Sequence, residues 1–214
     1  MISSRDICKQ INNITVFATQ CSLCNKQEWA TEKNGCISWS GNNEISEIIR
    51  NIPYKDSYDM LLQKKAYNMQ LLDGALIQMQ YLFNSKGLQK HRLAYFPSPT
   101  LIDFSSFEKE YEDDDEYLDI ISQNIVHVPI RFDYDKDNAK ELVHPESHLT
   151  LGQYKNCRIP VIAPIVPSVF MHFIFENFYS SIFKKNISRY PFDKERFDFS
   201  IKENEKTIIH IAFS

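Results

Sequence analysis

Apolar and polar residues alternate along residues 67–71 and again along residues 77–83. Alternation with a period of two is typical of β-strands that bury one face. Asp73 and Gly74 lie between the two runs, and an Asp-Gly pair favours the positive φ angles of a tight turn. The pattern therefore predicts a β-hairpin, and the alternation of residues 91–96 predicts a third strand.

Four more segments have the composition of strands, and several have the composition of helices. Residues 127–135 and 148–154 are predicted to pair with each other, and residues 35–41 and 207–213 are each predicted to form a strand. A first helix is predicted over residues 4–33 and is expected to stop at Asn34-Gly35. Two shorter helices are predicted over residues 42–52 and 116–124. Residues 108–119 are an acidic run that favours a solvated loop over a cation site.

A last helix is predicted to begin at Pro167 and Ser168 and to run to residue 183. Its apolar stripe has helical spacing and favours packing on a sheet over cofactor binding. The stripe consists of Phe170, Phe173, Ile174 and Phe178. Together the elements predict an α+β protein whose mainly antiparallel sheet carries an N-terminal helical segment and this C-terminal aromatic helix.

Composition limits the class of protein. The 214 residues are 43% hydrophobic, which suits one α+β domain over 1–214, with 1–60 mostly helical and 61–214 containing the sheet. The net charge of −4 excludes a generic basic nucleic-acid coat. The first ten residues are polar and unlike a signal peptide, and prolines interrupt the most apolar stretch, residues 161–179. We therefore expect a cytoplasmic protein without a membrane span.

Five cysteines are too few, and odd in number, for a secreted disulfide framework. Cys21 and Cys24 form one C-x2-C pair, with Cys8 and Cys36 on either side. Structural zinc sites usually show two such pairs, so free thiols are favoured, although a zinc site stays open. Cys157 stands apart and is expected to be a buried thiol.

Charged and titratable residues gather in one window of the sequence. Arg131, Asp133 and Asp135 alternate along one predicted strand and therefore share one face. His144 and His148 follow in the segment that leads into the predicted partner strand. Antiparallel pairing of the two strands would bring His148 close to Asp133 or Asp135. Three further residues, predicted to bind substrate together with Asp135, could join them: His91, Arg92 and Arg158.

These residue types suit phosphodiester cleavage without a metal or other cofactor. One imidazole would take a 2′-hydroxyl proton, the other would protonate the leaving oxygen, and Arg131 would neutralise the phosphate. Asp133 would orient an imidazole. Two alternatives stay open: two histidines and two aspartates could bind a divalent metal, or Arg131 could simply pair with an aspartate as part of the structure. Pro145 argues against a helical zinc motif.

Several motifs in order resemble the bacterial domain-of-unknown-function family 2290. They are "DGALIQMQYLF", "HRLAYFPSP", "VPIRFDYD", "HPESHLTLGQYKNCRIPV" and "PSVFMHFIFENFY". The resemblance brings no established activity. Small families of this kind often occur in mobile or phage-defence gene neighbourhoods, and the resemblance therefore implies a role in defence.

A second likeness is to small bacterial toxins with an R-[FY]-D strand and an H-x-H loop, matched here by Arg131, Phe132, Asp133, His144 and His148. The histidines depart from that pattern because they are four positions apart. We therefore expect an endoribonuclease-type effector of a toxin–antitoxin or phage-defence system, acting on RNA or another nucleic acid. The alternative is a non-catalytic binding or regulatory subunit of a larger defence complex, with a protein partner encoded nearby.

Overall fold

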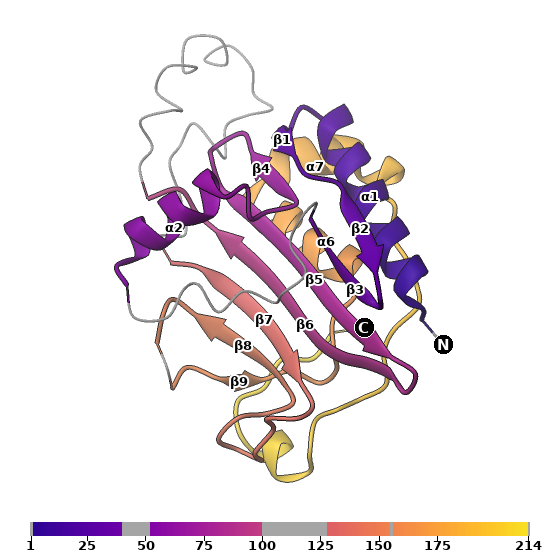
Figure 1. The fold of residues 1–214 in the computed structure, drawn as a ribbon, viewed down its shortest axis with the longest axis vertical. Coiled ribbons are helices and arrows are strands. Elements are labelled where there is room, and N and C mark those ends of the chain that lie inside the picture. Colours follow the sequence, from indigo (N-terminus) through magenta and orange to yellow (C-terminus); the bar gives the residue numbers. More distant parts are fainter. Residues whose placement is uncertain (1, 40–51, 100–127, 155, 214) are drawn as a thin grey trace.

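The structure is a computed structural model and describes residues 2–39, 52–99, 128–154 and 156–213. Within these ranges nine strands form one sheet, in the order β1-β4-β5-β6-β7-β8-β9, and the β2–β3 hairpin joins it where β3 pairs with β5 (Figure 1). The predicted helices at 42–52 and 116–124, and the acidic run, lie outside the described residues.

The strands are short at the two ends of the sheet and long in its middle. They are β1 Cys24–Gln27, β2 Ala30–Lys33, β3 Cys36–Trp39, β4 Met69–Leu71, β5 Leu76–Asn84, β6 Gly87–Phe96, β7 Ile130–Asp135, β8 Ser147–Leu151 and β9 Ile159–Pro160. The helices are α1 Ser4–Gln20, α2 Tyr54–Gln63, α6 Pro167–Phe178 and α7 Ser180–Asn186, with 3-10 turns η2 Ile187–Arg189 and η3 Asn204–Thr207.

The hairpins expected from the alternating pattern are confirmed. β4 and β5 pair antiparallel around the Asp73-Gly74 turn, where Gly74 has a φ of 84° and the Asp73 carboxylate accepts a hydrogen bond from the Ala75 amide. β5 pairs with β6 and β7 with β8, both antiparallel, as the strand patterns indicate. β6 and β7 also pair antiparallel, so the centre of the sheet is built from long, regular neighbours.

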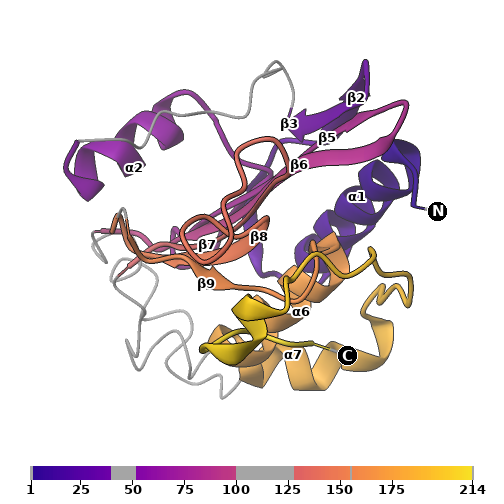
Figure 2. The same ribbon diagram turned by 90° about the horizontal axis from the view of Figure 1, so that it is seen from below.

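Helices cover the two faces of the sheet unequally. Figure 2 shows α1, α6 and α7 on one face and α2 on the other. The larger core lies under α1 and α6, where Phe170 of α6 meets Phe132 of β7 with ring centroids 6.1 Å apart. A smaller core lies under α2 and includes Ala94 and Phe96 of β6. The fold is therefore α+β, with an N-terminal helix and a C-terminal aromatic helix packed on a mainly antiparallel sheet.

The helix predicted over residues 4–33 is wrong beyond Gln20. Its start is as expected, because the Ser3 hydroxyl accepts a hydrogen bond from the Asp6 amide and the Asp6 carboxylate accepts one from the Ser3 amide. After Gln20 the chain turns and forms β1 and β2. The Asn34-Gly35 pair, interpreted as a helix stop, is the turn of the β2–β3 hairpin, and both residues have positive φ.

Two further expectations near the C-terminus need correction. Residues 207–213 do not form a strand; they follow η3 and contribute a single bridge from Ile211 to Val161. The predicted apolar stripe of α6 is only partly buried, because Phe173 is 37% exposed while Met171 and Phe175 are fully buried. The helix packs against both the sheet and α1, which widens its buried face. No helix in the described ranges has the length and apolar character needed to cross a bilayer.

Candidate functional site

The candidate site lies at the middle of three neighbouring strands. Arg92 of β6 stands directly opposite Asp133 of β7, and Asp133 stands directly opposite His148 of β8. Residues opposite each other in antiparallel strands point to the same face of the sheet. Arg131, two residues before Asp133, shares that face. It is the face on which α2 also packs, opposite to α1 and α6.

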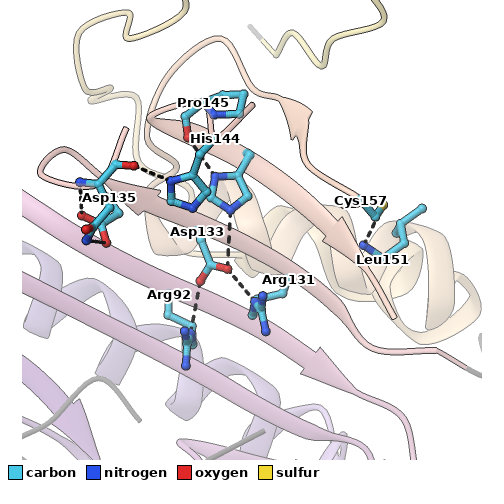
Figure 3. A network of polar contacts seen from close by, with 10 residues as sticks. Arg92, Arg131, Asp133, Asp135, His144, Pro145, Leu151 and Cys157 are labelled. Atoms are coloured by element: carbon cyan, nitrogen blue, oxygen red, sulfur yellow. Dashed lines mark hydrogen bonds and ion pairs between the residues drawn. The ribbon is translucent and has the colours of Figure 1, made fainter. Parts of the chain in front are cut away.

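Asp133 is the centre of the cluster. Its Oδ1 accepts a hydrogen bond from Nε of Arg92 at 3.1 Å, and its Oδ2 accepts one from Nε of Arg131 at 2.5 Å (Figure 3). Burial by itself raises the pKa of Asp133, but the two guanidinium groups outweigh burial and hold the pKa well below its usual range. The carboxylate is therefore ionised at neutral pH and bound between two cations.

His148 lies beside this ion cluster as a neutral imidazole. Burial lowers its pKa to about 4, against the opposing influence of the Asp133 carboxylate. Its Nδ1 is 2.9 Å from the backbone oxygen of Pro145. Because a carbonyl oxygen can only accept, Nδ1 carries the proton and Nε2 keeps a free lone pair. Nε2 is 3.9 Å from Oδ2 of Asp133, so a proton gained there would be stabilised by the carboxylate.

His144 is the more accessible of the two histidines. It is half-buried, and its ring centroid is 4.8 Å from that of His148. Its Nδ1 donates to the backbone oxygen of Asn138 at 2.8 Å, since that oxygen can only accept. The loop between β7 and β8 thus fixes both rings through backbone carbonyls rather than through a carboxylate. We expected Asp133 to set the tautomer of an imidazole, but the Pro145 oxygen does so for His148, and Asp133 lies near its unprotonated Nε2.

The structure brings most of the predicted site residues together, but not all. Asp135 shares the face of Asp133 and is bound by Lys90 at 3.3 Å and by Asn138. Arg158 is near enough for its charge to lower the pKa of His148.

His91 points to the opposite face of the sheet. It is 2% exposed, its Nε2 accepts a hydrogen bond from the Ile165 amide, and burial lowers its pKa to about 3. The alternating sequence indicates this placement, because His91 is two positions before Leu93 and four before Tyr95 and therefore shares the face of these core residues.

A C-terminal brace, formed by residues 200–205, holds the histidine loop, and sequence reasoning missed it. The histidine loop is the connection of residues 136–146 that carries His144 and leads to His148 of β8. The Ser200 and Ser147 hydroxyls are 3.0 Å apart, and the Lys202 ammonium is 2.7 Å from the Glu146 carboxylate. Glu205 is 1% exposed, and its carboxylate accepts hydrogen bonds from two backbone amides, one at residue 202 and one at residue 142. The histidine loop and the start of β8 are therefore fixed from a distant part of the chain.

No group of three or more metal-binding side chains is present in the described part of the chain. The cysteines considered for zinc are free thiols, and two of them donate to nearby backbone oxygens: Cys8 to Ala30 and Cys24 to Lys26. Burial raises the pKa of Cys24 to about 11, so this thiol is protonated at neutral pH. Cys157 is partly buried, and its sulfur accepts a hydrogen bond from the Leu151 amide (Figure 3).

Comparison with known proteins places this architecture in a family. The model of the family described as "Uncharacterized conserved protein (DUF2290)" matches residues 23–213, which include every strand of the sheet and all residues of the candidate site. Neither the curated proteins nor the solved structures gave a significant match. The resemblance carried by the sequence motifs is confirmed, and the chain belongs to the DUF2290 family.

Proposed function

We propose that this protein is a metal-independent nuclease of the endoribonuclease type, acting as an effector in a toxin–antitoxin or phage-defence system. The observation that carries the proposal is that His148 lies beside Asp133 and its two arginines on one face of the sheet. The ring of His144 lies 4.8 Å from that of His148. Two imidazoles and guanidinium groups are the components that cleavage of a phosphodiester by acid and base catalysis requires.

His148 is the general base in this proposal. Its Nε2 has a free lone pair, and its lowered pKa keeps the ring neutral at pH 7, which is the form that accepts a proton. Transfer of the 2′-hydroxyl proton to Nε2 lets the 2′-oxygen attack the neighbouring phosphorus. The resulting imidazolium is stabilised by the Asp133 carboxylate 3.9 Å away.

The other residues act on the phosphate and on the leaving group. Arg131 is the most exposed member of the ion cluster, with 24% of its side chain accessible, and it neutralises the charge that develops on the phosphate oxygens. The phosphate therefore approaches from the side of Arg131, because His148 itself is only 3% exposed. His144 gives a proton to the leaving 5′-oxygen, which completes the cleavage.

The test compares RNA cleavage by the wild type and by His148→Ala in the presence of a metal chelator. We expect the wild type to cleave and His148→Ala to be at least 100-fold slower, which is the usual contribution of a general base. His210→Ala is the matched control, because His210 is exposed and lies outside the site, and it should cleave like the wild type. The proposal fails if the wild type leaves both RNA and DNA intact and is as harmless to a bacterial host as His148→Ala.

A second candidate is a non-catalytic subunit that binds a protein partner in a defence complex. It is favoured by large apolar side chains exposed on the C-terminal segment, notably Phe199 at 76% and Ile209 at 84%. The discriminating experiment measures the biological phenotype of Arg131→Ala and His148→Ala. A phenotype that survives both substitutions, together with co-purification of the product of a neighbouring gene, favours the subunit. Loss of the phenotype with retained folding favours the nuclease.

A further inference from the structure

We propose that the loop between β8 and β9 makes this protein selective for single-stranded nucleic acid, with Tyr154 as a stacking platform for an unpaired base. Arg158, at the end of the same loop, binds a phosphate of the same strand. The proposal rests on the proposed function for the chemistry at His148, and it adds the class of substrate that the site accepts.

The ring of Tyr154 is exposed and yet held in a defined place. The residue is 72% exposed, while Gly152 beneath it is buried. A Cβ at Gly152 would lie 3.2 Å from both Cδ2 and Cε2 of the ring, so the ring edge rests directly on the glycine backbone. Gly152 has a φ of 64°, a conformation that glycine adopts without strain. The ring therefore keeps an accessible π-surface at little cost in conformational entropy.

Residues 152–153 of this loop are anchored at two points. The Gly152 amide donates to the backbone oxygen of Pro129 at 2.7 Å, just before β7. The Gln153 side chain donates to the Ser57 hydroxyl of α2 at 3.3 Å. These contacts fix the loop between β7 and the helix that covers the candidate site's face. A platform held in this way does not have to be ordered when a base binds to it.

Arg158 connects this platform with the ion cluster. Pro160 of β9 stands directly opposite His148, so an extended chain brings Arg158, two residues earlier, to the same face of the sheet. The effect of its charge on the pKa of His148 agrees with this placement. Arg158 and Arg131 thus provide cations on the two sides of β8. A phosphate backbone that crosses the strands could contact both of them.

The geometry separates the stacked base from the cleaved bond. Gly152 follows His148 by four positions, which is roughly 13 Å of extended chain. A base on Tyr154 therefore belongs to a nucleotide near the scissile one and not to the scissile nucleotide itself. In a duplex that base would be paired and stacked within the helix, and its face would be closed to the tyrosine. Every base has a π-surface, so the platform selects single strands with little preference for sequence.

The experiment measures binding of a fluorescein-labelled, 2′-O-methylated RNA oligonucleotide by fluorescence anisotropy, because the methylated strand cannot be cleaved through its 2′-oxygen. We expect the wild type to bind the single strand more tightly than a duplex of the same sequence. Tyr154→Ala and Tyr154→Leu should each weaken single-strand binding roughly tenfold, whereas Tyr154→Phe, which keeps the ring, should bind like the wild type. Arg158→Ala should reduce the slope of log K against log salt by about one.

Folding is checked by thermal unfolding. The unfolding temperature of the Tyr154 variants should equal that of the wild type, because the tyrosine ring is exposed. Equal affinity for single strand and duplex, or unchanged binding by both Tyr154→Ala and Tyr154→Leu, would overturn the inference. Cleavage of the unmodified strand is measured separately. If the expected binding pattern is found without cleavage, the nuclease proposal fails and the stacking platform stands. If the wild type cleaves but the Tyr154 substitutions do not change binding, only the proposed role of Tyr154 is refuted.

Discussion

Replacing Asp133 by asparagine should destabilise the fold more than any other single charge removal on β7. The substitution preserves the size of the side chain and removes only its negative charge. Arg92 and Arg131, which are 13% and 24% exposed, would then share a neutral amide and repel each other on neighbouring strands. The expected cost follows from the charges that lose their partner, not from lost packing.

The magnitude can be worked from the two contacts, at 3.1 Å and 2.5 Å. At an effective dielectric constant near 20, the gross attraction is about 5 kcal/mol for the longer contact and about 7 kcal/mol for the shorter one. A large part of this attraction offsets the desolvation of the ions. Removing one partner of a buried ion pair costs about 3–5 kcal/mol. Because asparagine still offers one acceptor oxygen, we expect about 3 kcal/mol, equivalent to roughly 6–12 °C in Tm.

The assay is urea unfolding at pH 7, followed by circular dichroism. Asp135→Asn is the matched control, because Asp135 lies on the same strand and face but pairs with Lys90 near the solvent, and its loss should cost less than about 1 kcal/mol. A second test combines Asp133→Asn with Arg131→Met, which removes the repulsion and should restore part of the stability. If Asp133→Asn is as stable as Asp135→Asn, the cluster does not carry the energy assigned to it.

Three more predictions concern pH, the brace and a turn. Folding lowers the pKa of His148 to about 4 and that of His91 to about 3. The free energy of unfolding should therefore fall by on the order of 3 kcal/mol for each histidine as the pH drops from 6.5 towards 4. A urea-unfolding free energy that stays constant over that interval would contradict this. Glu205→Ala should cost about 1–3 kcal/mol in urea unfolding because two backbone amides lose their acceptor, whereas Glu205→Gln should cost less, and equal stabilities would show that the brace is dispensable. Gly35→Ala should cost more than about 2 kcal/mol in thermal unfolding because its Cβ would lie 2.3 Å from a backbone oxygen of β5, whereas Gly87→Ala, with no atom within 4 Å, should lose clearly less.

The sequence was sufficient for the parts of the fold that depend on local pattern. The β4–β5 hairpin follows from alternation around Asp73 and Gly74, and the pairing of β7 with β8 follows from two strand-like runs. The register of β7 and β8 did not follow, because the pattern left open whether His148 lies opposite Asp133 or Asp135. The segment after Gln20 was not predictable in the same way, because residues 22–33 have no clear period. Asn34-Gly35 is also compatible with two different structures, a helix end and a hairpin turn.

The candidate site was predictable only where neighbouring strands define it. The pairing of β7 with β8 brings His148 close to Asp133. Because side chains alternate between the two faces of a strand, Arg92 of β6 points to the face of Asp133 and His91 points to the other face. The tautomer of His148 was not predictable, because it depends on a backbone oxygen whose direction is set by the loop conformation. The contacts of Glu205 were equally hidden, since no local pattern indicates which distant amides a buried carboxylate will bind.

The C-terminal brace has a consequence for the order in which the candidate site can form during synthesis. Ser200 is 53 positions after Ser147, so the histidine loop leaves the ribosome well before the residues that fix it. Until then the histidine loop and the start of β8 are without their brace, and the arrangement proposed for His144 and His148 is incomplete. A nascent chain would in this way spare the messenger RNA from which it is being translated. If the proposed nuclease activity holds, the order of synthesis would delay it until residues 200–205 have left the ribosome and reached the histidine loop.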